Sequence, residues 1–391
     1  MSHACFVAWE SSEFASSSRG AMSATFLAAA AVRAASATAA TTASANSAGG
    51  RSGGLLAVPG FFDREKGAPL LRRNAGFLSL EGLPDGWRAR LDGWPALAGA
   101  TLRPDQADPG CEDEAALRIF LRDAERTFQD EGHRTQMIEL LKRVWPENRD
   151  YHQGLGYVAS LLMLFFDTET IVRILLRLTH DQRYTPGYWK AAPEAYVRDA
   201  MVYARLVEER FPAVAAKLQS ACIVPEAYAS KWFIGLCVHV LPYASLLRYI
   251  EAFLTEGYVF LFKFALALVE TLCPKLLALK ASDVNIMLEL LRLDTCHFPD
   301  NEENEAFFLR LVADAQAVEL DRAHVDALRV EEGEKLEAKM KRTREREAQL
   351  AAEAEDDEIV FSDEVSSQMP CSPLERVLMP RLPRLPRGLP T

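Results

Sequence analysis

The sequence contains no Cys-x-x-Cys pair, and its seven cysteines are scattered along 391 residues. Paired cysteines at short spacing mark zinc sites and regular even sets mark disulfide frameworks, so neither is predicted. Cys222, Cys237 and Cys273 lie in apolar helical stretches, and we expect small buried residues in a reducing compartment. The adjacent pair Cys296-His297 offers too few ligands to predict zinc or thiol chemistry, so no metal site is expected.

The chain also lacks an excess of basic residues and a long uncharged apolar run. Its formal net charge is −11 and its pI is about 5.3, which argues against general binding of nucleic acid. The longest apolar stretch, Gly257 to Cys273, is interrupted by Lys263 and Glu270. It is too short and too charged for a membrane span, so we predict a buried core helix and no transmembrane segment.

Alternation of apolar and polar residues, which marks half-buried strands, is scarce. From about 75 to 295 apolar residues recur at helical spacing instead, which predicts an all-α, multi-helix domain. The flanking segments have biased compositions. Residues 1–55 are predicted to be a disordered low-complexity segment, with a targeting leader as the alternative. Residues 302–355 are predicted to form a charged helix or weak coiled coil. Residues 356–391 are predicted to be a disordered tail, first acidic and then Pro/Arg-rich with PxxP spacing.

One short stretch, "DYHQGLGY" at 150–157, places a glutamine before an apolar helix and admits three interpretations. The letters "GLGYVA" match a dinucleotide-binding fingerprint, but no strand precedes them, so such a site is not predicted. In the second interpretation, Asp150 caps a helix and Gln153 is an incidental polar residue in its first turn. In the third, Gln153 is directed at the active site of a partner.

The third interpretation requires a companion motif, and "FLRDAERTF" at 120–128 supplies one. Phe120, Asp123 and Arg126 recur at helical spacing on one face. The Asp123 carboxylate, three residues before Arg126, can hold the guanidinium in one orientation. The alternative is an ordinary surface ion pair of about 0–1 kcal/mol.

Together these motifs resemble the TBC domain family of Rab GTPase-activating proteins, over residues 80 to 280. The matching positions are Arg90-x-x-x-Trp94, Phe120-x-x-Asp123-x-x-Arg126 with Phe in place of the usual Ile, Tyr151-His-Gln153-Gly154, and Arg248-Tyr-Ile-Glu251 where the family usually has Arg-x-Trp-Asp. A competing register reads Phe128-x-x-Glu131-x-x-Arg134, but it contains Gly132, a poor residue inside a helix. The interval from Arg126 to Gln153 is short for the family.

The resemblance implies a regulator that completes the active site of a Rab-family GTPase in its GTP form, and that is not an enzyme on its own. Arg126 and Gln153 would be the arginine and glutamine fingers, while the GTPase holds GTP and Mg²⁺, so no cofactor of the chain's own is expected. Asp123 would orient Arg126, Gly154 would allow close approach to the partner, and Tyr151 and Trp94 would pack behind the fingers, with Arg90 in support.

The implied setting is vesicle trafficking in the cytoplasm, with peripheral association to endomembranes through the GTPase. A catalytically inactive TBC-fold scaffold that binds a GTPase is the alternative function. An unrelated helical scaffold is disfavoured, because the sequence has no internal repeat of about 30–45 residues.

Overall fold

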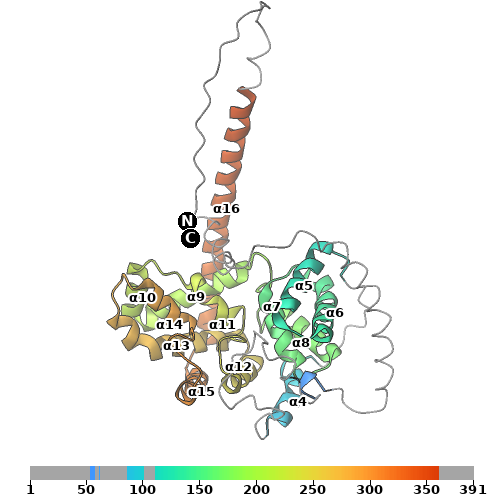
Figure 1. Cartoon of the computed structure of the whole chain (residues 1–391). Coiled ribbons are helices and arrows are strands. Elements are labelled where there is room, and N and C mark those ends of the chain that lie inside the picture. Colours follow the sequence, from blue (N-terminus) through green and yellow to red (C-terminus); the bar gives the residue numbers. More distant parts are fainter. Residues whose placement is uncertain (1–52, 58–60, 62–85, 101–110, 361–391) are drawn as a thin grey trace, which may run out of the picture. The chain divides into compact units, whose positions relative to one another are not determined.

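The computed structural model of the chain describes residues 53–57, 61, 86–100 and 111–360 (Figure 1). Every regular element within these ranges is a helix, which confirms the all-α prediction. Predictions for the other residues, including nearly all of 1–55 and residues 361–391 of the tail predicted at 356–391, lie outside this description. Residues 356–360, the start of that predicted tail, are helical. In chain order the elements are η2 (Leu55–Ala57), α4 (Trp87–Leu97), α5 (Glu114–Thr127), α6 (Glu131–Asn148), α7 (Gln153–Met163), α8 (Thr168–His180), α9 (Glu194–Arg210), α10 (Pro212–Ser220), η3 (Pro225–Ala227), α11 (Ser230–Phe233), α12 (Tyr243–Glu256), α13 (Tyr258–Ala278), α14 (Val284–Arg292), α15 (Glu302–Ala317) and α16 (Arg322–Val360).

The described helices pack as two sets (Figure 1). In the first set α6 contacts α5, α7 and α8, and α7 contacts α5 and α8. The second set is arranged around α13, which contacts α9, α10, α11, α12, α14 and α15. Helix α4 contacts α8 of the first set and α12 of the second, so the chain's early residues help to join the two sets.

Helix α13 is the buried core helix that the apolar stretch predicts. Thirteen of its side chains are buried, and the charged Lys263 is satisfied by the Glu256 carboxylate at 2.8 Å and the Gln316 carbonyl at 3.0 Å. The break before α13 is at Gly257, whose φ is +72° and whose absent Cβ would lie 2.0 Å from the Arg183 carbonyl oxygen. Only glycine fits this crossing, which fixes the angle between α12 and α13.

The segment 302–355, expected to be one charged helix or a weak coiled coil, contains two helices with different environments. Helix α15 packs against α13 and α12 through buried apolar side chains that include Phe308 and Val312. Composition alone does not reveal this apolar face, because the first turn of α15 is rich in acidic residues. Helix α16 follows after a break at 318–321, and its side chains from 341 to 351 are all exposed.

The first part of α16 is fastened to α9 by a buried ionic cluster around Asp199. The Asp199 side chain is fully buried and accepts from Arg329 Nε at 3.0 Å and also from the second nitrogen of that guanidinium. It further accepts from the Tyr188 hydroxyl at 2.5 Å and from Arg198 Nε at 2.8 Å. A buried carboxylate with this many donors avoids the cost of an unpaired charge.

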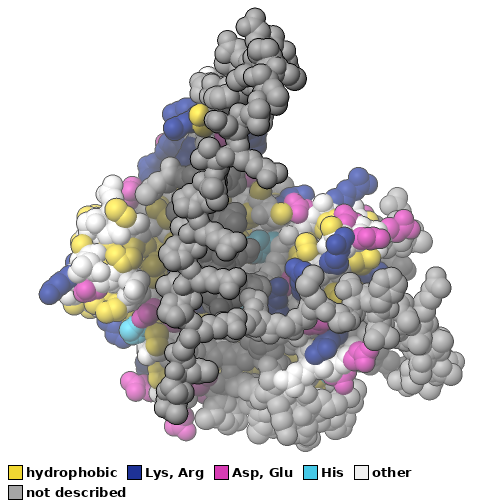
Figure 2. All heavy atoms as spheres, turned by 45° about the horizontal axis from the view of Figure 1, so that its top comes forward, with side chains coloured by type: hydrophobic (Ala, Val, Ile, Leu, Met, Phe, Trp, Pro, Cys, Tyr) yellow, Lys and Arg dark blue, Asp and Glu magenta, His cyan; other side chains and the backbone are white. Residues whose placement is uncertain are grey.

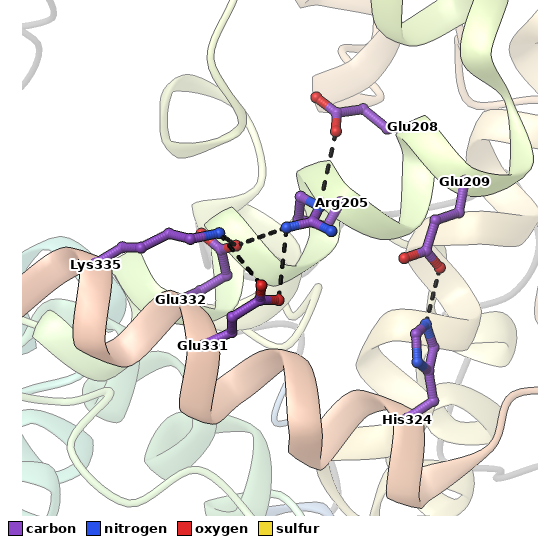
Figure 3. Close-up of polar contacts among 7 residues, drawn as sticks. All are labelled: Arg205, Glu208, Glu209, His324, Glu331, Glu332 and Lys335. Carbon is purple, nitrogen blue, oxygen red and sulfur yellow. Dashed lines mark hydrogen bonds and ion pairs between the residues drawn. The ribbon is translucent and has the colours of Figure 1, made fainter.

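A second cluster continues the contact between α9 and α16 (Figure 3). Arg205 reaches Glu332, which is 4% exposed, at 3.2 Å, and Lys335 reaches the same carboxylate at 2.7 Å. Nearer the start of α16, His324 Nε2 lies 2.8 Å from a Glu209 oxygen. Helix α16 therefore begins as part of the folded body.

The start of α7 is fixed by His152, and not by Asp150. The Nδ1 atom of His152 accepts from the Gly154 backbone N–H at 3.0 Å, while Asp150 accepts from the Tyr151 N–H at 2.8 Å. Burial lowers the pKa of His152 from 6.5 to about 4, with the nearby Asp150 opposing the shift. The imidazole therefore stays neutral near pH 7 and keeps its acceptor.

The described cysteines are unpaired. Cys237 is buried and Cys273 is half-buried, but Cys222 is exposed, so the expectation of a buried Cys222 is wrong. The reason is that α10 ends at Ser220, and Cys222 lies in the following turn with a φ of 53°.

Among the described helices, none has both the length and the hydropathy that are needed to cross a bilayer. Figure 2 shows Lys and Arg interspersed with Asp and Glu over the visible described surface.

We expect Arg329→Met to lower the free energy of unfolding by about 3 kcal/mol, because it leaves the buried Asp199 carboxylate short of its principal partner. Arg344→Met is the matched control on the same helix. Its partner Glu194 lies 3.7 Å away and the two side chains are 72% and 56% exposed, so the expected change is within about 1 kcal/mol. Urea titration measures both, and equal effects would contradict the described role of Asp199.

We expect His152→Asn to flatten the dependence of stability on pH in the acid range. The unfolded imidazole takes up a proton below pH 6.5, whereas the folded one resists until about pH 4. Stability from His152 is therefore complete above pH 6.5 and is lost as pH falls toward 4, by about 2 kcal/mol at about pH 5. Asn caps helices without titrating. Urea titrations across this range would contradict the account if the two proteins lost stability in parallel.

Candidate functional site

Arg126 stands on the last turn of α5, next to the end of the helix. Its NH1 atom lies 3.6 Å from Asp123 Oδ1, and its side chain is 46% exposed while that of Asp123 is 6% exposed. A cation in the last turn is favoured by the helix dipole. One terminal nitrogen of the guanidinium therefore lies beside a buried carboxylate, while the side chain as a whole is half-exposed.

Asp123 connects this helix to α7. The Tyr151 hydroxyl donates to Asp123 Oδ2 at 2.8 Å, and this bond is buried. Burial, followed by the charge of Asp123 and its hydrogen bond, raises the pKa of Tyr151 well above 10, so the hydroxyl keeps the proton that it donates. The rings of Phe120 and Tyr151 meet edge to face with centroids 5.1 Å apart. Phe120, the departure from Ile, thus supports the same contact.

Gln153 is the first residue of α7, two residues after Tyr151, and it is half-buried. One buried hydrogen bond therefore holds together the segments that carry Arg126 and Gln153. The loop before Gln153 is anchored in turn by Asn148, whose Nδ2 donates to the carbonyls of Asp150 at 2.8 Å and Trp189 at 3.1 Å.

Gly154 allows a close approach within the chain itself. A Cβ at this position would lie 2.5 Å from Ile234 Cγ2 and 2.7 Å from the Ile234 carbonyl oxygen. The same oxygen accepts from Trp189 Nε1 at 3.0 Å, so it cannot retreat freely. The first turn of α7 is thereby fixed against the residue that follows α11. Close contact of Gly154 with a partner stays a prediction.

Arg90 and Trp94 lie on α4, away from the bond between α5 and α7. Arg90 Nε donates to Glu251 Oε1 at 3.0 Å and its NH2 donates to the other oxygen. Trp94 is fully buried and its ring centroid lies 6.0 Å from that of Phe165. Glu251 on α12 thus provides the carboxylate for Arg90 where the family usually has Asp.

The competing register does not lie on one helix. Phe128 is extended after the end of α5, and Glu131 begins α6 after a cap at Asp130. Arg134 Nε donates to the Phe128 carbonyl at 2.6 Å, which ties it to the joint between the helices. The register that ends at Arg126 is continuous on α5.

The dinucleotide interpretation fails for a similar reason. Residues 154–159 lie within α7, and the described residues 111–153 that precede them contain no strand. A Cβ at Gly156 would lie 2.5 Å from the Tyr151 hydroxyl oxygen, so this glycine leaves room for the buried tyrosine. Both glycines serve helix packing.

Sequence reasoning missed Ile234, Trp189, Asn148 and His152. Ile234, Trp189 and Asn148 contact one another through backbone carbonyls and side-chain N–H groups although they are far apart in the chain. No sequence spacing indicates such contacts. His152 carried a signal, since it directly precedes Gln153 at the start of the apolar run, but histidine is an uncommon cap.

Part of the chain is similar to a known domain family and to several curated proteins. The Rab-GTPase-TBC domain matches residues 89–277. Carabin from Mus musculus is 30% identical over 224 residues, which cover 50% of this chain and 49% of Carabin. TBC1 domain family member 10B from Homo sapiens is 27% identical over 206 residues, or 48% of this chain and 25% of the relative. The chain therefore spans about half the length of these relatives or less.

Among solved structures, the Chlamydomonas flagellar RabGAP TBC domain aligns with a TM-score of 0.48 and 18% identity, covering 61% of this chain and 81% of that one. The match at 89–277 spans α4 to α13, which include the helices that carry Arg126 and Gln153. The chain therefore carries a domain of the Rab-GTPase-TBC family.

Proposed function

We propose that the chain is a GTPase-activating protein for a Rab-family GTPase in its GTP form, and that Arg126 and Gln153 act in trans on the bound nucleotide. The observation that carries this proposal is the buried hydrogen bond between Tyr151 and Asp123, 2.8 Å long, which joins the two finger-bearing segments. Two side chains that must reach one phosphate together need a fixed relation to each other.

Arg126 has the chemistry for the developing charge on the γ-phosphate. Guanidinium is planar, stays ionised, and can meet two phosphate oxygens at once. Its contact with Asp123 at 3.6 Å is long for a hydrogen bond, whereas Asp123 is held by the Tyr151 hydroxyl at 2.8 Å. An arginine supplied from outside contributes about 10³–10⁵ in rate.

Gln153 has the chemistry for the attacking water. Its amide oxygen accepts a hydrogen bond from water, and its NH₂ group donates toward phosphate. As the first residue of α7, it lies at the positive end of that helix dipole, which favours approach to an anion. The first turn of α7, fixed by His152 and Ile234, holds the backbone from which the Gln153 side chain extends.

The chain needs no cofactor of its own in this scheme, because the GTPase holds GTP and Mg²⁺. It completes the active site of its partner and is not counted as an enzyme by itself. Since Rab GTPases work on membranes, we place the proposed activity in vesicle trafficking, in the cytoplasm and peripherally on endomembranes through the GTPase.

The alternative is a TBC-fold scaffold that binds a GTPase without catalysis. It is motivated by the departures from the family pattern at Phe120 and Glu251. Both departures keep their local contacts, Phe120 with Tyr151 and Glu251 with Arg90, which supports an active protein.

For the GTPase that the chain activates, we expect Arg126→Ala to lower single-turnover GTP hydrolysis by about 10³-fold or more. Gln153→Ala should lower the rate of hydrolysis by about 10²-fold or more, because removing one preorganised polar group from an active site has an effect of that size. The measurement is hydrolysis by a panel of GTP-loaded Rab GTPases with each variant. Arg118→Ala is the matched control, because it removes an exposed arginine of the same helix whose partner is Glu114 at 3.8 Å.

Three outcomes would count against the proposal. Loss of activity with Arg134→Ala but not Arg126→Ala would assign the finger to the other register. An equal loss with Arg118→Ala would indicate general electrostatic attraction. Binding of GTP-loaded Rab GTPases without any acceleration would identify the scaffold.

A further inference from the structure

We propose that Glu289, Cys296 and His297 form a binding site for one zinc ion, at the turn between α14 and α15. This site is independent of the proposed GTPase-activating function. The sequence alone shows only the adjacent pair at 296–297, whereas the fold adds Glu289 from α14 as a third ligand.

The donor atoms of the three side chains are close enough to share an ion. All lie within 4.8 Å of one another, and His297 Nε2 is 2.9 Å from Glu289 Oε2. Bond lengths of about 2.0–2.3 Å and tetrahedral angles put zinc ligands about 3.3–3.8 Å apart. The His297–Glu289 separation is slightly shorter than that value and no separation exceeds 4.8 Å, so side-chain rotations can bring the three atoms around one ion.

The turn that holds these ligands is formed by the backbone. Leu293 ends α14 in the left-handed region with a φ of 59°. The Asp294 N–H donates to the Glu289 carbonyl at 3.0 Å, and the Asp294 carbonyl accepts from the N–H groups of His297 at 3.0 Å and Phe298 at 3.1 Å. Ligands on a turn that is already closed lose little conformational freedom on binding.

Two buried side chains flank the ligand pair and fix it to the core. Leu293 and Phe298 are each 2% exposed, and the Phe298 ring stacks on that of Phe307 in α15 at 5.3 Å. Asp294 is held by Lys231 Nζ at 2.9 Å, which leaves the other three groups as the ligand set. The site therefore rests on rigid elements.

The donor types select zinc. One thiolate, one imidazole and one carboxylate are soft, borderline and hard donors, a mixture that suits Zn²⁺ better than Mg²⁺ or Ca²⁺. The thiolate and the carboxylate balance the charge of the ion. Three protein ligands leave the fourth position open for water.

Zinc binds cysteine as the thiolate, so the ion must displace the thiol proton of Cys296 on binding. Zinc affinity is therefore expected to rise with pH.

The test uses the full chain stripped of metal, titrated with Zn²⁺ against a chromophoric chelator, with Cd²⁺ to detect a thiolate-to-metal absorption band. Wild type is expected to bind one equivalent more than Cys296→Ser, and the band should disappear in that variant. His297→Gln and Glu289→Gln should each weaken binding by about 100-fold or more, since even residues behind the ligands cost about 10–100-fold.

Cys222→Ser is the matched control, because Cys222 is also exposed and forms no such group with the other described residues. It should bind zinc as wild type does, and circular dichroism of each variant should match wild type. The proposal is overturned if Cys296→Ser retains the stoichiometry and affinity of wild type, or if wild type binds no zinc. It is overturned too if only the cysteine matters, because the site is then a lone thiol.

Discussion

The buried hydrogen bond from Tyr151 to Asp123 is the contact on which the candidate site depends. It joins the end of α5 to the start of α7 across 28 positions in the chain. Asp123 uses its other oxygen for Arg126, so one carboxylate sets the relation between the arginine and the segment that carries Gln153. Removing either partner would leave a polar group buried without its bond, at about 1–3 kcal/mol. The rest of the first helical set keeps this bond away from water.

The second helical set supports the site from the other side. Ile234 follows α11 and is the surface against which the first turn of α7 closes, with Gly154 as the residue that permits the contact. Helix α13 contacts α11 and is covered by α15, so the position of Ile234 depends on packing that continues well beyond the finger motifs. Helix α16 adds a buried ionic attachment to α9 through Asp199.

Helical periodicity was sufficient to predict the all-α fold, the buried α13 and the helical placement of Asp123 and Arg126, because these depend on local spacing. The motifs also led to the family. The features that could not be predicted depend on contacts between distant residues, or on an apolar face that the acidic composition of a helix concealed. The capping role of His152 depends on a pKa lowered by burial. A helix was predicted over α15, but its buried face was missed because the acidic first turn outweighed four buried apolar residues. The third ligand of the proposed zinc site, Glu289, is brought near by a left-handed residue, Leu293.

In the proposed function, Arg126 and Gln153 act together on the transition state of GTP hydrolysis. The most direct measurement is the affinity of the chain for its Rab GTPase loaded with GDP, with and without aluminium fluoride, which mimics the phosphoryl group in transfer. We expect binding at least about 100-fold tighter with the mimic, and loss of that difference in the Arg126→Ala and Gln153→Ala variants. Equal affinity with and without the mimic would contradict it.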